Sequence, residues 1–215
     1  MWATLCGSAL RLCRLLFQII NAPLSAPTSA PDPAPRLTPR LLLRPYNFDD
    51  DNNDAAAFFA LIAANRSRLR PSFPKREAAA SSVEASARLL AQFRHDWRTG
   101  RLYVLGIWHH PDGRYLGDIS LKPNWNAPIT LEIGYYLDAE AEGQGYAREA
   151  LAAAVAFGFN TLGAARLLIR CLPDNPRSSA VAEGLGFRLL PVRPRPWLQR
   201  VLSGGPNVLY YILKR

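Results

Sequence analysis

Cysteine and histidine are scarce in this chain, and their scarcity narrows the chemistry that it can perform. The 215 residues contain only three cysteines, two near the N-terminus and Cys171, without a CxxC pair. Neither a disulfide framework nor a cysteine-based zinc site is therefore expected, and a reducing compartment fits best. The three histidines are His95, in a helix-like stretch, and His109 and His110, just before a Pro-Asp-Gly turn that usually meets solvent. We assign none of them a catalytic role.

Acidic residues are also few relative to basic ones. The chain has 17 Asp and Glu against 26 Lys and Arg, which gives a formal net charge of +9. Such an excess suits contact with nucleic acid, anionic lipid or an anionic ligand, but it bears on association rather than on fold. The basic residues do not form runs interleaved with aromatics, and no zinc-finger or helix-turn-helix signature is present. We therefore expect no specific nucleic-acid binding.

A long uninterrupted apolar run is missing as well. The stretch 2–20 is apolar but contains Arg11, Arg14 and Gln18, whereas a transmembrane helix needs about 20 predominantly apolar residues. The pattern predicts a short basic amphipathic helix, followed by an Ala/Pro/Ser-rich linker at 22–35. Organelle targeting, contact with a membrane surface and an extension without function all remain open for this segment. We expect residues 1–36 to lie outside the core and the protein to be cytoplasmic.

What remains is ordered like one packed domain, which we place at 37–215. Helix-like and strand-like patterns follow one another along it. They are a strand at 40–44, a helix from Asp54, a helix opened by a Ser81/Glu84 capping box and ending near 98, strands at 102–108, 114–121 and 129–137, a helix from about 145, a strand at 166–171, a helix from Asn175, and strands near 187–192 and 208–213. This order predicts an α/β fold of the mixed α+β kind, with one mixed sheet and helices on both faces.

A glycine-containing turn, Gly143-Gln144-Gly145-Tyr146-Ala147, lies between a predicted strand and a predicted helix. Glycines allow the backbone to approach a ligand closely, and the free amides and dipole at a helix start favour an anion such as a diphosphate. Two glycines at this spacing also occur in ordinary strand-to-helix turns. The motif alone therefore leaves both interpretations open.

In its wider context the stretch Gly143–Ala150 resembles the coenzyme A turn of the GNAT superfamily of acetyltransferases, in the RimJ/RimL-like branch that acetylates ribosomal-protein N-termini. Other stretches carry the resemblance in the same order: Leu41–Pro45, Leu116–Leu121, Glu132–Leu137, Asp174–Glu183 and Leu185–Phe187. The resemblance implies the GNAT fold, with a central mixed seven-stranded sheet, about four helices and the order β-α-α-β-β-β-α-β-α-β-β. It also implies acetyl-CoA as the acetyl donor, and we expect no metal.

The resemblance further implies residue roles around the donor. The amides of residues 143–147 would hold the diphosphate, and the strands before and after the following helix would splay apart to admit the pantetheine arm. Asn175 would contact that arm, although Asn-Pro is also a favoured helix start. Ser178 would lie near the thioester sulfur as proton donor, because Ala182 occupies the family's usual tyrosine position. The expected cofactor-binding residues are Ile133, Tyr135, Gly143, Gln144, Gly145, Tyr146, Ala147, Asn175 and Ser178; a backbone amide around 133–135 would polarise the thioester carbonyl.

A base is expected as well, because an α-amino group with a pKa of about 7.7 to 8.0 must lose a proton before it attacks. Glu132 resembles the family's acid in this strand, although pairing with an arginine at the sheet surface fits its position equally well. Glu77, Glu84 and Asp118 are other carboxylates that could reach the cleft. Glu77 belongs to the loop that helps form the acceptor pocket in this family, and Phe73 and Trp97 could wall that pocket.

Two residues set limits on this resemblance. Glu142 stands where the family usually has Gln or Arg, and a carboxylate beside the diphosphate would weaken binding if it pointed inward. We expect it to point to solvent, with Arg148 as a potential counter-charge. Cys171 ends an apolar strand without a histidine nearby in sequence, which favours a core cysteine over a nucleophile.

We therefore expect an acetyl-CoA-dependent N-acetyltransferase that acts on a primary amine by direct attack in a ternary complex, with a protein N-terminal α-amine as acceptor. The alternatives are a small-molecule amine acceptor, such as a polyamine or an aminoglycoside-like compound, and a catalytically weak CoA-binding module. A third class would use the basic N-terminal helix and the acid-free run at the C-terminus to dock on a ribosome or membrane. The oligomeric state is left open between monomer and homodimer.

Overall fold

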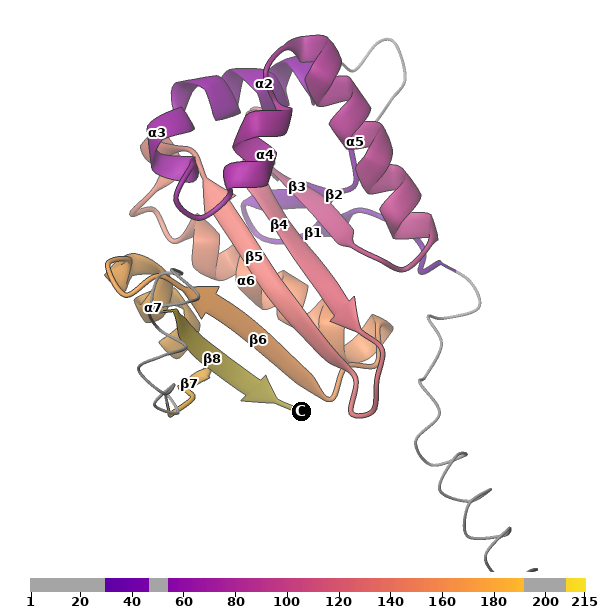
Figure 1. Cartoon of the computed structure of the whole chain (residues 1–215), viewed down its shortest axis with the longest axis vertical. Helices are drawn as coiled ribbons and strands as arrows, with labels where there is room; N and C mark the ends of the chain where they lie inside the picture. The colour runs from indigo at the N-terminus through magenta and orange to yellow at the C-terminus, as the bar shows by residue number, and fades with distance from the viewer. Residues whose placement is uncertain (1–29, 47–53, 192–207) are drawn as a thin grey trace, which may run out of the picture.

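The computed structural model describes residues 30–46, 54–191 and 208–215. The predicted amphipathic helix, most of the linker, the two N-terminal cysteines and the acidic turn before Asp54 lie outside these described residues. Within them, one eight-stranded mixed sheet forms the centre, in the order β1-β2-β3-β4-β5-β6-β8-β7 (Figure 1). None of the described helices combines the length and apolar content needed to cross a bilayer.

The strands follow the predicted positions closely, with one addition. Their bounds are β1 Arg36–Leu37, β2 Leu41–Arg44, β3 Tyr103–His109, β4 Tyr115–Asn124, β5 Thr130–Leu137, β6 Arg166–Cys171, β7 Arg188–Leu189 and β8 Leu209–Lys214. The expectation of seven strands was wrong by one, because the two-residue β1 pairs with β2 and extends the sheet. Residues 31 and 36, which we expected outside the core, also contact the domain: Pro31 accepts a hydrogen bond from Trp97, and Arg36 lies over the ring of Phe157.

Six α-helices are described where about four were expected. They are α2 Asp54–Ala64, α3 Arg66–Leu69, α4 Pro74–Ala79, α5 Val83–Arg98, α6 Tyr146–Ala156 and α7 Pro176–Glu183, with short 3-10 and π segments at Ala139–Ala141 and Phe157–Thr161. The extra two, α3 and α4, occupy the region that the sequence indicated as a loop. Pro74 stands in the first turn of α4, where its fixed φ and missing N–H are tolerated.

The capping residue of α5 also differs from the prediction. Ser82, not Ser81, has the extended backbone of an N-cap, and its hydroxyl accepts a hydrogen bond from the amide of Ala85. The helix therefore begins one residue later than a Ser81/Glu84 box would place it. Glu84 contributes by accepting a hydrogen bond from the Ser82 hydroxyl at 2.7 Å.

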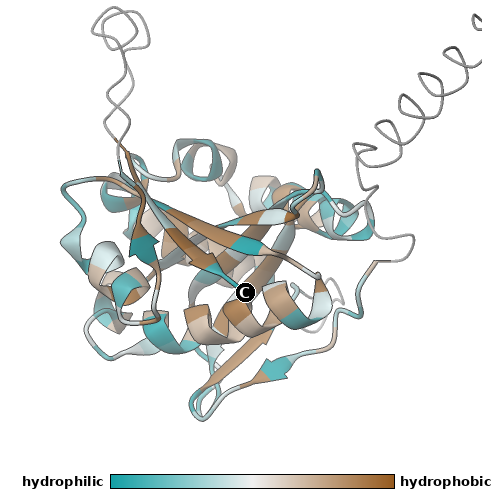
Figure 2. Cartoon of the chain, turned by 90° about the horizontal axis from the view of Figure 1, so that it is seen from below, coloured by the Kyte–Doolittle hydropathy of each residue, from teal (hydrophilic) through white to brown (hydrophobic). Residues whose placement is uncertain are grey.

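Helices cover both faces of the sheet, so successive strand residues enter two different cores. Helices α2 to α5 lie on one face and α6 lies on the other (Figure 1). In β3, Leu105 and Ile107 join the cluster under α6, whereas Val104 and Trp108 join the cluster under α2 and α5. The central strands are mostly apolar, and polar residues gather on outer helix faces and loops (Figure 2). This two-sided burial explains why the strands read as almost continuous apolar runs.

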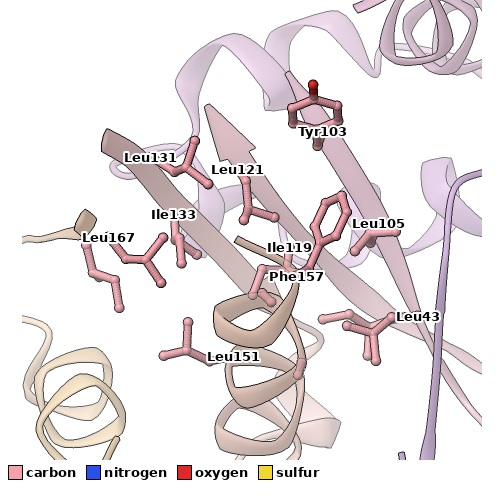
Figure 3. Packing of buried hydrophobic residues seen from close by; sticks show 14 of the residues in the cluster. Leu43, Tyr103, Leu105, Ile119, Leu121, Leu131, Ile133, Leu151, Phe157 and Leu167 are labelled. Atoms are coloured by element: carbon pink, nitrogen blue, oxygen red, sulfur yellow. The ribbon is translucent and has the colours of Figure 1, made fainter. Parts of the chain in front are cut away.

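The end of α6 packs very closely on the sheet. Leu151 and Phe157 point toward strand residues such as Leu121 and Ile133 (Figure 3). A Cβ at Gly158, in the π segment after α6, would come within 2.9 Å of the end of the Leu167 side chain, so a larger residue there would force that side chain to move. Because α6 is held tightly against the sheet, the turn at its N-terminus has a fixed position.

The parallel pair β5 and β6 is joined along only half of β5. The paired residues run from Thr130 with Arg166 to Ile133 with Ile169. Beyond that point, β5 stays paired with β4 as far as Leu137, whereas the end of β6 stays paired with β8. The two strands diverge toward their carboxyl ends (Figure 1), as the resemblance implied.

Candidate functional site

A cavity of about 560 Å³ lies where β5 and β6 have parted. Its walls come from the residues before α4, the end of β5, the turn before α6 and the start of α7. They include Arg68, Ser72, Phe73, Tyr135, Tyr136, Leu137, Glu142, Gly143, Gly145, Tyr146, Ala147, Asn175, Arg177, Ser178 and Val181. A volume of this size is typical of small-molecule and cofactor sites.

The turn at 143–147 presents free backbone amides to this cavity. Gly143 and Gly145 have φ values of +76° and +81°, a left-handed conformation that glycine adopts at little cost. Among the described residues, no acceptor takes a hydrogen bond from the amides of residues 143–147. Those amides and the N-terminus of the 11-residue α6 together favour an anion, and the space beside Gly143 is open, since a Cβ there would meet nothing within 4 Å.

The turn is held in place by Arg40, which directly precedes β2 and contacts both the turn and α6. The Arg40 guanidinium donates to a carboxylate oxygen of Glu149 at 2.8 Å and to the Gln144 carbonyl at 2.9 Å. Thr38 donates to Glu149 at 2.6 Å. Partial burial alone would raise the pKa of Glu149, but the hydrogen bonds from Thr38 and Arg40 outweigh it and lower that pKa. Gln144, expected among the cofactor-binding residues, thus has its carbonyl bound to Arg40 and does not line the cavity.

Contrary to our expectation, Glu142 does not point to solvent but lines the cavity. Its two carboxylate oxygens accept from Arg68 of α3 and Arg177 of α7, and all three side chains line the cavity. Arg148, the predicted counter-charge, instead donates to the carbonyl of Gly184. Two arginines, one from α3 and one from α7, therefore neutralise the acidic residue, whereas the sequence analysis expected Arg148 to do so.

Asn175 and Ser178 meet at the start of α7. The Asn175 side-chain oxygen accepts from the Ser178 amide at 3.1 Å, which is the N-cap geometry that the sequence favoured. Both residues also line the cavity. The capping interpretation and the ligand interpretation of Asn175 are therefore compatible.

Two side chains, from β5 and β6, converge on the hydroxyl of Ser178 in α7. The oxygen of Ser178 lies 3.0 Å from the Tyr135 hydroxyl and 3.2 Å from the Cys171 sulfur, which donates to it. Burial raises the pKa of the Cys171 thiol and raises the pKa of Tyr135 to about 12. A protonated, 3% exposed cysteine agrees with the prediction of a core residue rather than a nucleophile.

The acceptor-side residues that we expected are only partly brought together. Phe73 lines the cavity and packs edge-on against Tyr136, with ring centroids 5.2 Å apart. Glu77 does not line it and accepts from Arg66 at 2.8 Å. Trp97 is in the core, stacked on Phe157 at 5.8 Å, and so does not wall this cavity.

The other candidate acids lie outside the cavity too. Asp118 is fully buried and bonded to Arg76, Tyr46 and Tyr136. Glu132 lies in the still-paired part of β5, about half exposed, with its carboxylate 3.4 Å from the Arg170 guanidinium. Glu84 lies in the first turn of α5 and accepts a hydrogen bond from Ser82, the N-cap residue. Ile133 is buried and is the last β5 residue paired with β6.

Sequence reasoning missed Arg68, Arg177 and Arg40, and it missed the role of the Tyr135 side chain. No periodicity relates these residues to the turn, because they lie 35 to 109 positions away from their partners. The departure at Glu142 was the one available signal. An acid beside an anion site calls for a cation nearby, but not for a particular one.

Comparison with known proteins identifies the family. The profile of the acetyltransferase (GNAT) domain matches residues 40–188, more than half of the chain. The "Probable N-acetyltransferase YjcK" of Bacillus subtilis (strain 168) is 29% identical over 107 residues, which are 49% of this chain and 59% of that protein. The "Ribosomal-protein-serine acetyltransferase" of Escherichia coli (strain K12) is 42% identical over 60 residues, 28% of this chain and 34% of that protein. This chain thus matches less than two thirds of the length of either relative.

Solved structures agree on the fold. RimL, a ribosomal L7/L12 alpha-N-protein acetyltransferase in complex with coenzyme A, superposes with a TM-score of 0.66 at 22% identity, over 83% of this chain and 96% of that one. A putative ribosomal-protein-serine acetyltransferase from Vibrio cholerae gives 0.62 at 23% identity, over 86% and 99%. At these identities the likeness concerns the fold, and together with the profile match it establishes that the chain belongs to the acetyltransferase (GNAT) family.

Proposed function

We propose that this protein transfers the acetyl group of acetyl-CoA to the α-amino group of a protein N-terminus, within a complex that holds donor and acceptor together. One observation carries the proposal. A single cavity joins the free amides of residues 143–147 to Ser178 and Phe73 through the gap between β5 and β6. In this proposal the catalytic domain comprises residues 37–215, with residues 31 and 36 packed against it.

The donor would be bound by the backbone of the turn and by the start of α7. The amides of residues 143–147 would hold the diphosphate, and Arg68 and Arg177 line the same cavity. The pantetheine arm would pass between the parted strands beside Asn175, so that the thioester comes near Ser178. The backbone of Ile133 to Tyr135 borders this gap, and an amide there would polarise the carbonyl, a contribution of about 3 kcal/mol to the barrier.

The chemistry then requires three changes in bonding. The amine nitrogen attacks the thioester carbon, the carbon–sulfur bond breaks, and the sulfur leaves with the electron pair as Ser178 donates to it. Glu132 would take the proton of the amine through water. Its carboxylate is about half exposed, and the residue lies one position before Ile133, the last β5 residue that is paired with β6. Both substrates must be present at once, and no covalent enzyme intermediate is formed.

The acceptor would enter from the side of α3 and α4. Phe73 and Tyr136 give this end of the cavity an aromatic wall, and Arg68 adds a positive charge. Glu77 lies on α4, the helix that follows Phe73, and accepts a hydrogen bond from Arg66 of α3. Two of the similar proteins are named as acetyltransferases of ribosomal proteins, which supports a protein N-terminus as the acceptor class.

The test is release of coenzyme A thiol from acetyl-CoA in the presence of an acceptor panel. The panel contains peptides with free Ser or Ala N-termini, the same peptides already N-acetylated, a polyamine and an aminoglycoside, and calorimetry first establishes acetyl-CoA binding. We expect turnover with the free peptides only. Turnover with the polyamine or the aminoglycoside alone would show that the acceptor is a small-molecule amine and not a protein N-terminus. Tight binding of acetyl-CoA without turnover on any amine would indicate a CoA-binding module.

A further inference from the structure

The hydroxyl of Ser178 has more neighbours than a serine on a cavity wall requires. It is bonded to the Cys171 thiol at 3.2 Å and lies 3.0 Å from the Tyr135 hydroxyl. The two partners come from β6 and β5, on either side of the gap. This arrangement therefore bridges the two parted strands through the first turn of α7.

Counting hydrogens defines what the serine can do. A serine hydroxyl has one hydrogen to donate and two lone pairs to accept with. Cys171 occupies one lone pair, because its thiol donates. If Tyr135 donates to the second, both lone pairs are filled and the single hydrogen of Ser178 must point to a third direction. The remaining open neighbour is the cavity, which Ser178 lines.

Both donors keep their hydrogens at physiological pH. Burial raises the pKa of Tyr135 to about 12, and it raises the pKa of the Cys171 thiol. The direct hydrogen-bond partners of Ser178, which are Tyr135, Cys171 and Asn175, carry no charge. The charged residues Arg68, Glu142, Arg148 and Arg177 line the same cavity, and the Glu142 carboxylate is bonded to Arg68 and Arg177.

We propose that Tyr135 is a positioning residue for departure of the thiol: its hydroxyl donates to Ser178 and so directs the only hydrogen of Ser178 at the sulfur of coenzyme A. This inference rests on the proposed function. In the reaction, the nitrogen–carbon bond forms, the carbon–sulfur bond breaks with its electron pair on sulfur, and the sulfur accepts the hydrogen bond of Ser178. The proton of the amine goes to the base, and Tyr135 neither gains nor loses a proton.

The alanine at position 182 agrees with this role. It lies one turn after Ser178 on α7, is fully buried and has no polar atom on its side chain. The helix therefore supplies no second donor at that place. The Tyr135 hydroxyl also lies within hydrogen-bond distance of the Ser178 carbonyl, at 3.3 Å. If Tyr135 donated to that carbonyl instead, the Ser178 hydroxyl would be free to donate to Tyr135. The experiment must distinguish these two arrangements.

The experiment compares Tyr135→Phe, Ser178→Ala and the double variant, with Tyr211→Phe as matched control. Tyr211 also ties a strand to α7, through Glu183 at 3.1 Å, but it does not line the cavity. We expect Ser178→Ala to lower kcat about 10- to 100-fold and Tyr135→Phe about 5- to 10-fold, each with less than a twofold change in the KM for acetyl-CoA. The double variant should be no slower than Ser178→Ala, since Tyr135 acts only through the serine.

A second readout needs no acetyl transfer. The ultraviolet absorbance of the thiolate gives the pKa of coenzyme A bound to the protein, after subtraction of the CoA-free protein. We expect this pKa to lie below that of free coenzyme A in the wild type and to rise by about half a unit or more in Tyr135→Phe, because a hydrogen bond to the charged form favours that form.

The outcomes separate the two proposals. If coenzyme A does not bind, the proposed function itself fails. If coenzyme A binds and turns over, but Tyr135→Phe changes neither kcat nor the pKa of the bound thiol, only the role of Tyr135 is overturned. Effects of Tyr135→Phe and Ser178→Ala that multiply in full, or an equal loss in Tyr211→Phe, would also overturn it.

Discussion

Ile133 of β5 and Ile169 of β6 are the last two residues paired across the parallel strands. After this pair, the backbone of β5 is hydrogen-bonded on one side only, to β4. The end of β6 stays paired with β8. The opening is lined by the turn before α6 on one side and the start of α7 on the other. One break in strand pairing thus creates the gap through which a donor thioester can reach the acceptor side.

The turn before α6 should lose its ligand when a side chain is added at Gly145. In Gly145→Leu the new Cβ stands 3.3 Å from the Arg40 guanidinium, at a φ of +81°. Gly113→Leu is the control, because its φ of +69° imposes the same backbone strain in a hairpin turn away from the cavity. Both variants should lose about 1 to 2 kcal/mol of stability, and only Gly145→Leu should bind acetyl-CoA at least about tenfold more weakly by calorimetry. Retained affinity would count against the turn as the diphosphate site.

Removing the charge of Glu142 should strengthen donor binding. Glu142→Gln frees Arg68 and Arg177 from their shared carboxylate, so that both can face the phosphates. These ion pairs are partly exposed and each contributes at most about 1 kcal/mol, which corresponds to about a two- to fivefold decrease in Kd for acetyl-CoA. Glu140→Gln is the control, since Glu140 is a neighbouring exposed acid with no ion pair among the described residues. Weaker binding by Glu142→Gln would show that the carboxylate orients the arginines instead of competing with the ligand.

The base can be identified by a pair of variants. Glu132→Gln should lower kcat and flatten its rise with pH, because a neutral amide takes no proton. Glu77→Gln, in which the lost carboxylate is held by Arg66, should leave that pH profile unchanged. Initial rates across a pH series measure both. The reverse pattern would move the base to Glu77.

Glu149 should contribute to stability in a pH-dependent way. The pKa of its carboxyl lies below the ordinary value of 4.5, because the hydrogen bonds from Thr38 and Arg40 outweigh partial burial. A group with a lowered pKa stabilises the folded protein above its unfolded pKa, and this contribution is lost as the pH falls through the folded pKa. Glu149→Gln should therefore cost about 1 to 2 kcal/mol in urea unfolding at pH 7 and progressively less below pH 4.5. A loss that is the same at every pH would place the effect in packing.

Two truncations should show where the folded domain begins. Removal of residues 1–29 leaves in place the Trp97–Pro31 hydrogen bond, the Arg36 contact over Phe157 at 3.8 Å, and β1. Removal of residues 1–36 deletes the first two contacts and part of β1. We expect the shorter truncation to unfold at the same urea concentration as the full chain and the longer one to lose about 2 to 3 kcal/mol. Equal stability of both would return the boundary to residue 37.

Local pattern was sufficient for most of the elements. Alternating and continuous apolar runs gave the strands from 102 to 171 within a few residues, because a sheet that is covered on both faces buries nearly every side chain. Asn175-Pro176 gave the start of α7, since capping is a local interaction. The short β1 and the pair α3 and α4 were missed, because elements of two to six residues are too short to show a hydrophobic period.

The sequence by itself determined the order of strands and helices, the glycine turn before α6 and the serine at the start of α7, because each depends on residues within a few positions of one another. Tertiary structure alone decided that Glu142 lies between Arg68 and Arg177, that Arg40 supports the turn, that Trp97 belongs to the core, and that Tyr135, Cys171 and Ser178 meet. These contacts join side chains from separate elements. Their geometry follows from how strands pair and part across the sheet, which no local spacing in the chain encodes.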